Sequence, residues 1–137
     1  MKTFFDSSAL AKRYIDEQGS GAVDDLCMGA SALAISVICV PEVISALNRR
    51  LREGAIQRTD YTKAKQYLSD DVRDVVVINL TSAVVSSCIS LLETNPICAM
   101  DALHVACALE WKAQLFVSSD KRQIAAAKKA GLHVQQV

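Results

Sequence analysis

Four acidic residues, far apart in the sequence, occupy positions where a carboxylate is costly unless a positive group binds it. Asp6 and Asp120 follow short apolar runs that look like strands, and Glu42 opens the segment after a third such run. Asp101 lies in a nearly uncharged stretch, with Glu110 the next charge after it. A divalent cation is the simplest positive group that could bind them, and a cation held by carboxylates can cut phosphodiester bonds.

Each acid also has an ordinary structural explanation. Asp6 and Asp120 stand where a strand gives way to a helix, so either can be a helix N-cap. Glu42 lies in the first turn of its predicted helix, where the macrodipole favours an acid. Asp101 is harder to explain in this way, because its helix is apolar nearly all round and is expected to be packed inside. A functional role is the better explanation for Asp101.

The expected sheet places the four acids at one edge. In an open parallel sheet, ligands bind outside the carboxyl ends of the strands, and helices that follow strands begin at that edge. Four carboxylates there would repel one another unless a cation offset their charge. Oxygen ligands without a nearby cysteine pair favour Mg²⁺ or Mn²⁺ over zinc. The sequence therefore predicts a site in which a metal ion is bound by Asp6, Glu42, Asp101 and Asp120.

Polar residues beside the acids are candidates for supporting roles. His104 lies one helical turn after Asp101 on the same face, so it could carry protons or be a hydrogen-bonded structural group. Four serines flank two of the acids, and they could orient a carboxylate or a metal-bound water, or simply cap helices; they are Ser7, Ser8, Ser118 and Ser119.

Two arginines extend from the acids along one predicted helix. Arg49 and Arg52 share a polar stripe with Glu42 and Ser45, at helical spacing. Seven residues of helix rise about 10 Å, so these arginines could hold RNA phosphates a nucleotide or two from the metal; a solvated face or a subunit contact would explain them equally well. The net charge is zero, so affinity for RNA must come from such local basic clusters.

Short apolar runs alternate with longer helix-period segments, which is typical of a single α/β domain with a mostly parallel sheet. We place this one domain over residues 1–137. The predicted strands are Lys2–Phe5, Leu33–Ser36, Val75–Asn79, Leu115–Val117 and His133–Gln136. The predicted helices are Ser8–Glu17, Gly21–Met28, Pro41–Glu53, Thr59–Arg73, Ser82–Glu93, Ala99–Lys112 and Lys121–Ala130.

The composition is that of a globular, cytoplasmic protein. Hydrophobic residues make up 51% of the chain and charged residues 22%. The five cysteines are odd in number, form no C-x-x-C pair and have apolar neighbours, so we expect small buried side chains in a reducing cytosol. We find no signal peptide and no apolar stretch near the roughly 20 residues that cross a bilayer, so no membrane association is expected.

Four segments carry a resemblance to a known family. They are FFDSSALAKRY at the start, VPEVISAL, MDALHVACAL, and LFVSSDKRQIAAAKKAGLHV near the end. Together and in this order they resemble the PIN domain, specifically the VapC-type toxins of prokaryotic toxin–antitoxin pairs. The resemblance covers essentially the whole chain, and the combination of D-S-S-A-L with D-A-L-H-V-A is its most specific part.

The resemblance implies a Mg²⁺- or Mn²⁺-dependent endoribonuclease with a three-layer α/β/α sandwich, commonly a homodimer, inhibited by an antitoxin protein. Carried over by position, its acidic site is that of the four acids above. Many relatives have a threonine or an acid where this chain has Ser118, and an arginine or lysine often precedes the D-A-L-H motif where this chain has Ile97, Cys98 and Met100. For the dimer interface, we expect the surface around Tyr61, Tyr67 and Leu68.

The mechanism expected from these residues is hydrolysis of RNA by in-line attack of a metal-activated water. Asp6, Asp101 and Asp120 would hold the metal, and Glu42 would bind a second ion or position the nucleophile. A non-catalytic PIN-fold module that binds a protein partner is the main alternative. A haloacid-dehalogenase-like phosphatase needs an acid at position 8, which is Ser8, and a receiver domain needs an acid after the strand that ends at Asn79.

Overall fold

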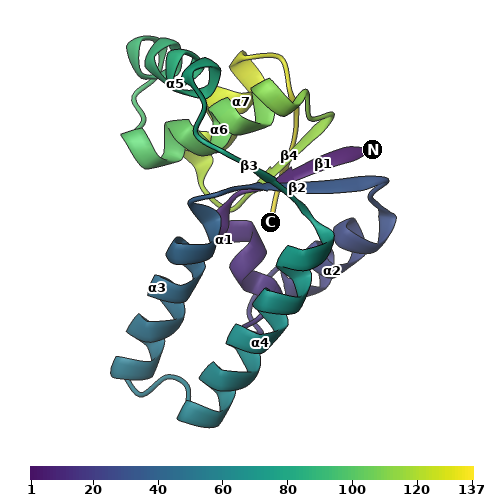
Figure 1. Ribbon diagram of the computed structural model, residues 1–137, viewed down its shortest axis with the longest axis vertical. Helices are drawn as coiled ribbons and strands as arrows, with labels where there is room; N and C mark the ends of the chain where they lie inside the picture. Colours follow the sequence, from purple (N-terminus) through teal and green to yellow (C-terminus); the bar gives the residue numbers. More distant parts are fainter.

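The computed structural model describes residues 1–137, which form one five-stranded sheet with helices on both faces (Figure 1). The strands are β1 (Lys2–Phe5), β2 (Ala32–Ser36), β3 (Val76–Ile78), β4 (Leu115–Ser118) and β5 (His133–Gln136). All of them pair in parallel, in the order β3-β2-β1-β4-β5. The predicted mostly parallel α/β fold is therefore confirmed, and the sheet is parallel throughout.

Seven α-helices connect the strands, and each predicted helix has a counterpart among them. They are α1 (Ser7–Leu10), α2 (Ser20–Gly29), α3 (Cys39–Arg52), α4 (Arg58–Asp74), α5 (Ser82–Thr94), α6 (Ala99–Trp111) and α7 (Lys121–Lys129), and a 3-10 turn, η1 (Ala11–Arg13), follows α1.

The strand order creates a switch point between β1 and β4. From β1 the chain moves outward through β2 to β3, and it then crosses back to place β4 on the other side of β1. The two central strands pair in register, with Phe4 opposite Phe116. At such a switch point the connections leave the sheet in opposite directions, which opens a crevice at the carboxyl ends of the two strands.

Alternating residues of the central strands feed two separate cores. Phe4 and Phe116 stack with ring centroids 5.9 Å apart in a core that includes side chains of α5, α6 and α7. Phe5 and Ile35 point to the opposite face and pack in a core built with α1, α2, α3 and α4. Successive residues of a strand point to opposite faces of the sheet, so one short strand supports both helical layers.

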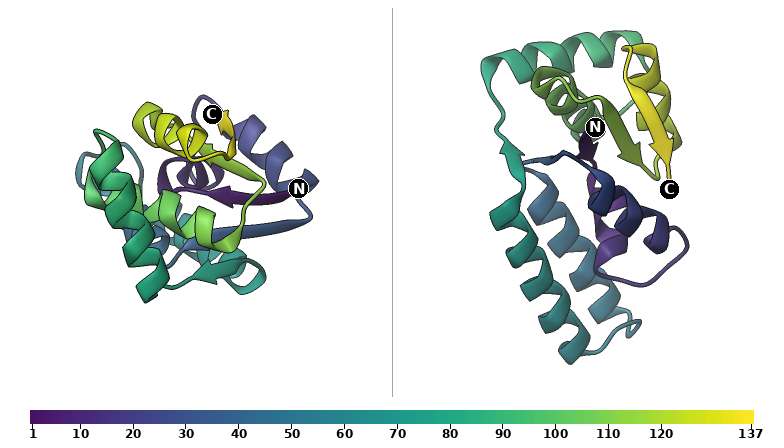
Figure 2. Two further views of the ribbon diagram at one scale, coloured as in Figure 1. Left: turned by 90° about the horizontal axis from the view of Figure 1, so that it is seen from above. Right: turned by 90° about the vertical axis from the view of Figure 1, so that its right-hand side faces the viewer.

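The three layers are visible in Figure 1 and from two further directions in Figure 2. The helices α5, α6 and α7 lie on one side of the sheet, and α3 and α4 form a hairpin that extends away from the other side. The turn between α3 and α4, residues 53–57, is the part of this hairpin farthest from the sheet (Figure 1). None of the helices combines the length and the apolar character that crossing a membrane requires.

Two details of the helices differ from the sequence-based expectation. The helix predicted over Ser8–Glu17 leaves α-helical geometry after Leu10 and tightens into η1, after which both Arg13 and Tyr14 hydrogen-bond to Asp71 on α4. The helix predicted from Thr59 begins at Arg58, directly after its N-cap residue Gln57, whose backbone N–H donates to the Asp60 carboxylate at 2.9 Å. The first difference depends on Asp71, which is far away in the sequence and which local propensity does not include.

The cysteines are all free, but they are not all buried as expected. Cys39, Cys88 and Cys107 are buried, Cys27 is half-buried, and Cys98 is exposed. Cys98 is the N-cap residue of α6, so it stands outside the regular helix where packing is incomplete.

Candidate active site

Asp6 is the residue that leads from β1 into α1. Its backbone N–H donates to the Val117 carbonyl at 3.1 Å, next to the last residue pair of the β1–β4 ladder. Its carboxylate caps α1 by accepting from the Ala9 N–H at 2.9 Å. The predicted helix-capping role is therefore confirmed. This capping does not account for the burial of the carboxylate, because the residue is 0% exposed.

Two serine hydroxyls complete the surroundings of the Asp6 carboxylate. The Ser8 hydroxyl lies 2.8 Å from each carboxylate oxygen, and the Ser118 hydroxyl donates to Oδ2 at 2.7 Å. Burial raises the pKa of Asp6 above its usual value, and the hydrogen bonds from Ser118 and Ala9 offset that effect only in part. The protein therefore keeps a buried acid at the switch point, although its charged form is disfavoured there.

Glu42 projects from the first turn of α3, as predicted. Its Oε1 accepts a hydrogen bond from the Ser7 hydroxyl at 2.7 Å and lies 2.5 Å from Nε2 of His104. The hydrogen bond with His104 lowers the pKa of Glu42, against the opposing effect of burial. Glu42 is therefore held ionised by groups from two different elements, α1 and α6.

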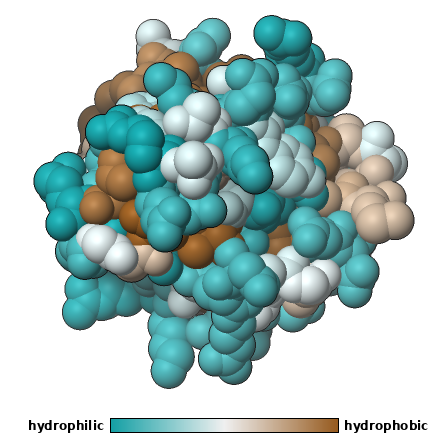
Figure 3. Space-filling model, turned by 90° about the horizontal axis from the view of Figure 1, so that it is seen from below, coloured by the Kyte–Doolittle hydropathy of each residue, from teal (hydrophilic) through white to brown (hydrophobic).

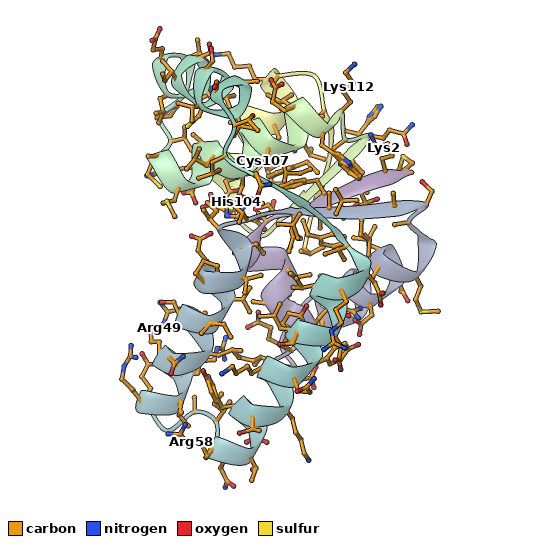
Figure 4. All side chains as sticks on the ribbon, in the orientation of Figure 1. Lys2, Arg49, Arg58, His104, Cys107 and Lys112 are labelled. Atoms are coloured by element: carbon orange, nitrogen blue, oxygen red, sulfur yellow. The ribbon has the colours of Figure 1, made fainter.

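His104 connects the two helical layers. It is 1% exposed and lies on α6, and Nε2 contacts both Glu42 and the Ser7 hydroxyl, the latter at 3.1 Å. Figure 4 shows His104 beside the start of α3. Its other ring nitrogen, Nδ1, is buried without a hydrogen-bond partner. His104 therefore supports the site through its contact with Glu42, which crosses the edge of the sheet.

The third and fourth acids meet at α7. Asp120 caps this helix by accepting from the backbone N–H groups of Arg122 and Gln123 at 2.8 and 3.3 Å. Gln123 in turn donates its side-chain N–H to Oδ1 of Asp101 at 2.9 Å. The other oxygen of Asp101 accepts from the Cys98 thiol at 2.9 Å. Asp101 is half-buried and partnered, and not buried and unpaired as expected; Asp6 is the fully buried acid.

A continuous series of hydrogen bonds and adjacent residues joins all four acids. Ser118 contacts Asp6 and also accepts from the backbone N–H of Asp120 at 2.9 Å. Ser7, next to Asp6 in the chain, contacts Glu42, and Gln123 links Asp101 to Asp120. All four acids therefore belong to one polar region at the carboxyl ends of β1, β2 and β4, where the parallel sheet predicted them.

A cleft of about 480 Å³ opens beside this region. Ser7, Ser8, Glu42 and Ser119 line one part of it, and the remaining lining includes three basic side chains, Lys12, Arg49 and Arg50. In Figure 4, Arg49 lies toward the far end of α3, whereas His104, on α6, lies beside the start of α3. Arg52, the other predicted phosphate ligand, is not among the lining residues. Viewed from below, the end of the molecule carrying the α3–α4 turn is mostly hydrophilic, with apolar side chains in its recesses (Figure 3).

No lysine or arginine pairs with any of the four acids. The one contact that any of them makes with a basic side chain is that between Glu42 and His104. Two arginines pair with other acids, Arg13 with Asp71 and Asp24, and Arg50 with Glu17. In this arrangement no three acidic, histidine or cysteine side chains are positioned to hold a metal ion together; the Asp6 and Asp101 carboxylates are instead hydrogen-bonded to neighbouring donors.

The donor set nevertheless fits a hard divalent cation in its chemistry. Carboxylate and hydroxyl oxygens predominate, and these are the ligands that Mg²⁺ and Mn²⁺ prefer. Three buried side-chain atoms lack any hydrogen-bond partner, and all three belong to residues that contact or adjoin the acids: His104 Nδ1, Ser119 Oγ and Gln123 Oε1. Buried polar atoms without partners mark places where water or a ligand completes the structure.

Gln123 is the site residue that sequence reasoning missed. It lies inside the segment LFVSSDKRQIAAAKKAGLHV but carries no charge and has no predicted role there. A signal was present, since Gln123 falls three residues after Asp120, on the face of α7 that also carries Ala126 and Ala127. A polar side chain on a buried helical face needs a partner.

Comparison with known proteins identifies the family to which this fold belongs. The family model of the PIN domain matches residues 3–129. The chain therefore belongs to the PIN domain family. The comparison with curated proteins finds no match.

Among solved structures, the fold is similar to that of VapC20 from Mycobacterium tuberculosis, described as a toxin that cleaves the sarcin–ricin loop. That match has a TM-score of 0.69 and 20% identity, and it covers 95% of each chain. A DNA-bound VapBC from Salmonella typhimurium matches with a TM-score of 0.70 and 10% identity over 99% of this chain and 98% of that one. A toxin–antitoxin complex from Klebsiella pneumoniae gives 0.68 and 15% identity over 90% of each chain. These likenesses describe the fold.

Proposed function

We propose that this PIN domain is a metal-dependent endoribonuclease that acts as the toxin of a toxin–antitoxin pair. The observation that supports the nuclease most strongly is that four acids share one hydrogen-bonded polar region at the switch point, with no lysine or arginine paired with any of them. Such a site suits a divalent cation, and a divalent cation suits the hydrolysis of a phosphodiester. The toxin role draws on VapC20 and the toxin–antitoxin complex with the same fold.

In this proposal each side chain has a role set by its position in the site. Asp6, Asp101 and Asp120 would hold Mg²⁺ or Mn²⁺, and Glu42 would bind a second ion or orient the attacking water. When bound, the metal supplies a water of lowered pKa and neutralises charge on the phosphate oxygens. Ser7 and His104 fix the Glu42 carboxylate by contacting Oε1 from two elements.

The basic part of the cleft is the proposed track for the RNA backbone. Lys12, Arg49 and Arg50 line the same cleft as Ser7 and Glu42. Arg49 is exposed and forms no ion pair. Its guanidinium is therefore free to donate two parallel hydrogen bonds to one phosphate. Arg50 is already paired with Glu17 at 2.8 Å. We therefore assign the main phosphate contact to Arg49, with Arg52 beyond the cleft in a secondary role.

We further propose that the protein is a cytoplasmic homodimer that an antitoxin protein inhibits. Val85, Ile89 and Leu92 form an exposed apolar stripe on α5, spaced at helical periodicity. This helix contains one charged residue, Glu93. The stripe of one copy can therefore pack against the same stripe of a second copy without bringing several like charges together, and a two-fold interface pairs identical surfaces in this way. The predicted interface around Tyr61, Tyr67 and Leu68 is less suitable, because Leu68 is 2% exposed and belongs to the core.

The test of the nuclease combines RNA cleavage with metal binding. RNA cleavage should require Mg²⁺ or Mn²⁺ and should fall by orders of magnitude in Asp101→Asn. Mn²⁺ should also raise the melting temperature of the wild type, since a ligand at a hundred times its Kd stabilises the folded state by about 2.7 kcal/mol. The same shift should be lost in Asp6→Asn and Asp101→Asn.

Asp25→Asn, which makes the same chemical change at an exposed position on α2, is the matched control and should behave as wild type. If Asp101→Asn retained full metal-dependent cleavage, the assignment of the site would be wrong. If neither metal altered the melting temperature and no RNA were cut, a non-catalytic module that binds a protein partner would be the better description.

A further inference from the structure

Gln123 is an unusual residue for the inner face of α7. It is 3% exposed, and its neighbours on this face, Ala126 and Ala127, are apolar and buried. Its side-chain N–H donates to Asp101 Oδ1 at 2.9 Å, and its backbone N–H is capped by Asp120. Gln123 therefore makes direct contact with two acids that come from different elements. An apolar side chain would fill this space at lower cost, so the amide has a purpose other than packing.

The unpaired oxygen of Gln123 indicates what that purpose is. Oε1 is buried and has no hydrogen-bond partner. The only other such side-chain atoms in the molecule belong to His104, which contacts Glu42, and to Ser119, which adjoins Asp120. Polar atoms of this kind are rare, and each one needs an explanation. Their restriction to the neighbourhood of the acids indicates that water or an ion completes the structure there.

Asp101 depends on Gln123 for its orientation. One carboxylate oxygen accepts from the Gln123 amide and the other from the Cys98 thiol, each at 2.9 Å. A thiol is a weak donor, and Cys98 is exposed, so the buried amide is the stronger of the two constraints. Each carboxylate oxygen has two lone pairs, so Asp101 can accept these bonds and still bind a cation.

We propose that Gln123 is a positioning residue for the metal site: its amide N–H fixes the Asp101 carboxylate, and its unpaired Oε1 would accept a hydrogen bond from water in the site. This inference depends on the proposed function and names a residue on which metal affinity should rest. Partners that orient metal ligands typically change metal affinity by about 10- to 100-fold when they are removed. A purely structural bond between α6 and α7 would change the melting temperature and leave the affinity for metal unaltered.

The test is the Mn²⁺ dissociation constant of the full-length protein, measured by isothermal titration calorimetry. Gln123→Met keeps the length of the side chain and removes both amide groups, and we expect Mn²⁺ binding to weaken by about 10- to 100-fold. Gln66→Met makes the same change on the exposed face of α4, where Gln66 contacts Asp70 only, and it should bind Mn²⁺ as the wild type does.

The possible failures can be told apart. If the wild type binds Mn²⁺ and Gln123→Met binds it equally well, the role of Gln123 is overturned and the proposed nuclease stands. If the wild type binds no Mn²⁺, the proposed nuclease fails and this inference with it. Should Gln123→Met fail to fold, Gln123→Asn retains an amide but withdraws it by one carbon; unchanged Mn²⁺ affinity in that variant would equally overturn the proposal.

Discussion

Asp6 shows, at the scale of one residue, how a site can oppose the stability of its own fold. The side chain is fully buried, and burial raises its pKa. Between its unfolded and folded pKa values, the folded protein holds a proton that the unfolded chain has released, so stability falls as pH rises through that range. At neutral pH, well above the usual aspartate value, burial of this carboxyl group therefore lowers the stability of the folded state.

Replacing Asp6 with asparagine should raise the melting temperature at pH 7 while abolishing metal-dependent cleavage. Asparagine has no charge to bury, and its oxygen can still accept from the Ala9 N–H. The gain should shrink as the pH falls toward the ordinary aspartate value of 3.8, because the folded wild type then carries a neutral, protonated Asp6, as neutral as the asparagine of the variant. Thermal melts at several pH values check this; Asp25→Asn is the exposed control, and an unchanged or lower melting temperature at pH 7 would contradict the argument.

Much of the candidate site could be predicted at this scale. Asp6 and Asp120 were found because acids after apolar strands are visible in the sequence, and Glu42 because it opens a helix. Gln123 could not be identified in the same way, because its role depends on the approach of α7 to α6. The partners of Asp101 depend on the same approach. Sequence patterns report local burial well, but the distance between two helices is set by the packing of the whole layer.

At the scale of elements, one carboxylate holds together the helices that cover one face of the sheet. Asp71 on α4 accepts two hydrogen bonds from Arg13, at 2.9 and 3.2 Å, and one from the Tyr14 hydroxyl at 2.7 Å. The Arg13 side chain is 14% exposed. Burial and the hydrogen bond with Asp71 raise the pKa of Tyr14 well above its usual range, so this hydroxyl keeps its proton.

Asp71→Ala should therefore lower the free energy of unfolding by about 1–3 kcal/mol, because buried donors on Arg13 and Tyr14 lose their acceptor. Urea denaturation measures this cost. Asp70→Ala, at the adjacent exposed position whose carboxylate contacts only Gln66, should cost no more than about 0.5 kcal/mol. Equal losses in the two variants would show that the contacts with Asp71 add nothing to stability.

The elements themselves were largely predictable, with the exception of the segment after β1. Alternation of short apolar runs and helical periods predicted all five strands, and every helix but the first, within a few residues. The helix expected to reach Glu17 ends early, because Arg13 and Tyr14 are used to contact α4. Helical periodicity describes the faces of one helix only. It therefore does not predict contacts such as those of Arg13 and Tyr14 with Asp71 on a helix far away in the sequence.

At the scale of the whole molecule, the two helical layers meet outside the apolar cores. Glu42 and Ser7 belong to the layer of α1 and α3, whereas His104 belongs to that of α6. The cores on the two faces are separate, so these polar contacts at the edge of the sheet fix how one layer sits relative to the other.

The exposed stripe on α5 allows a prediction about assembly. Ile89 is 50% exposed at its centre, so Ile89→Arg should leave the fold intact and place two like charges at the proposed two-fold contact. Sedimentation equilibrium should then show a dimer for the wild type and a monomer for Ile89→Arg. Lys65→Ala, on the exposed face of α4, should remain a dimer. A wild type that is monomeric at high concentration would exclude this interface.

The turn between α3 and α4 has a practical consequence. Its residues, 53–57, are mostly exposed and lie at the far end of the hairpin from the sheet, and Gly54 has a φ of 74° that ends α3. Loops of this kind tolerate added length at little entropic cost. Fluorescent labels, affinity tags or an extra reporter domain can therefore be grafted there, at the place where foreign chain would disturb the acidic centre least.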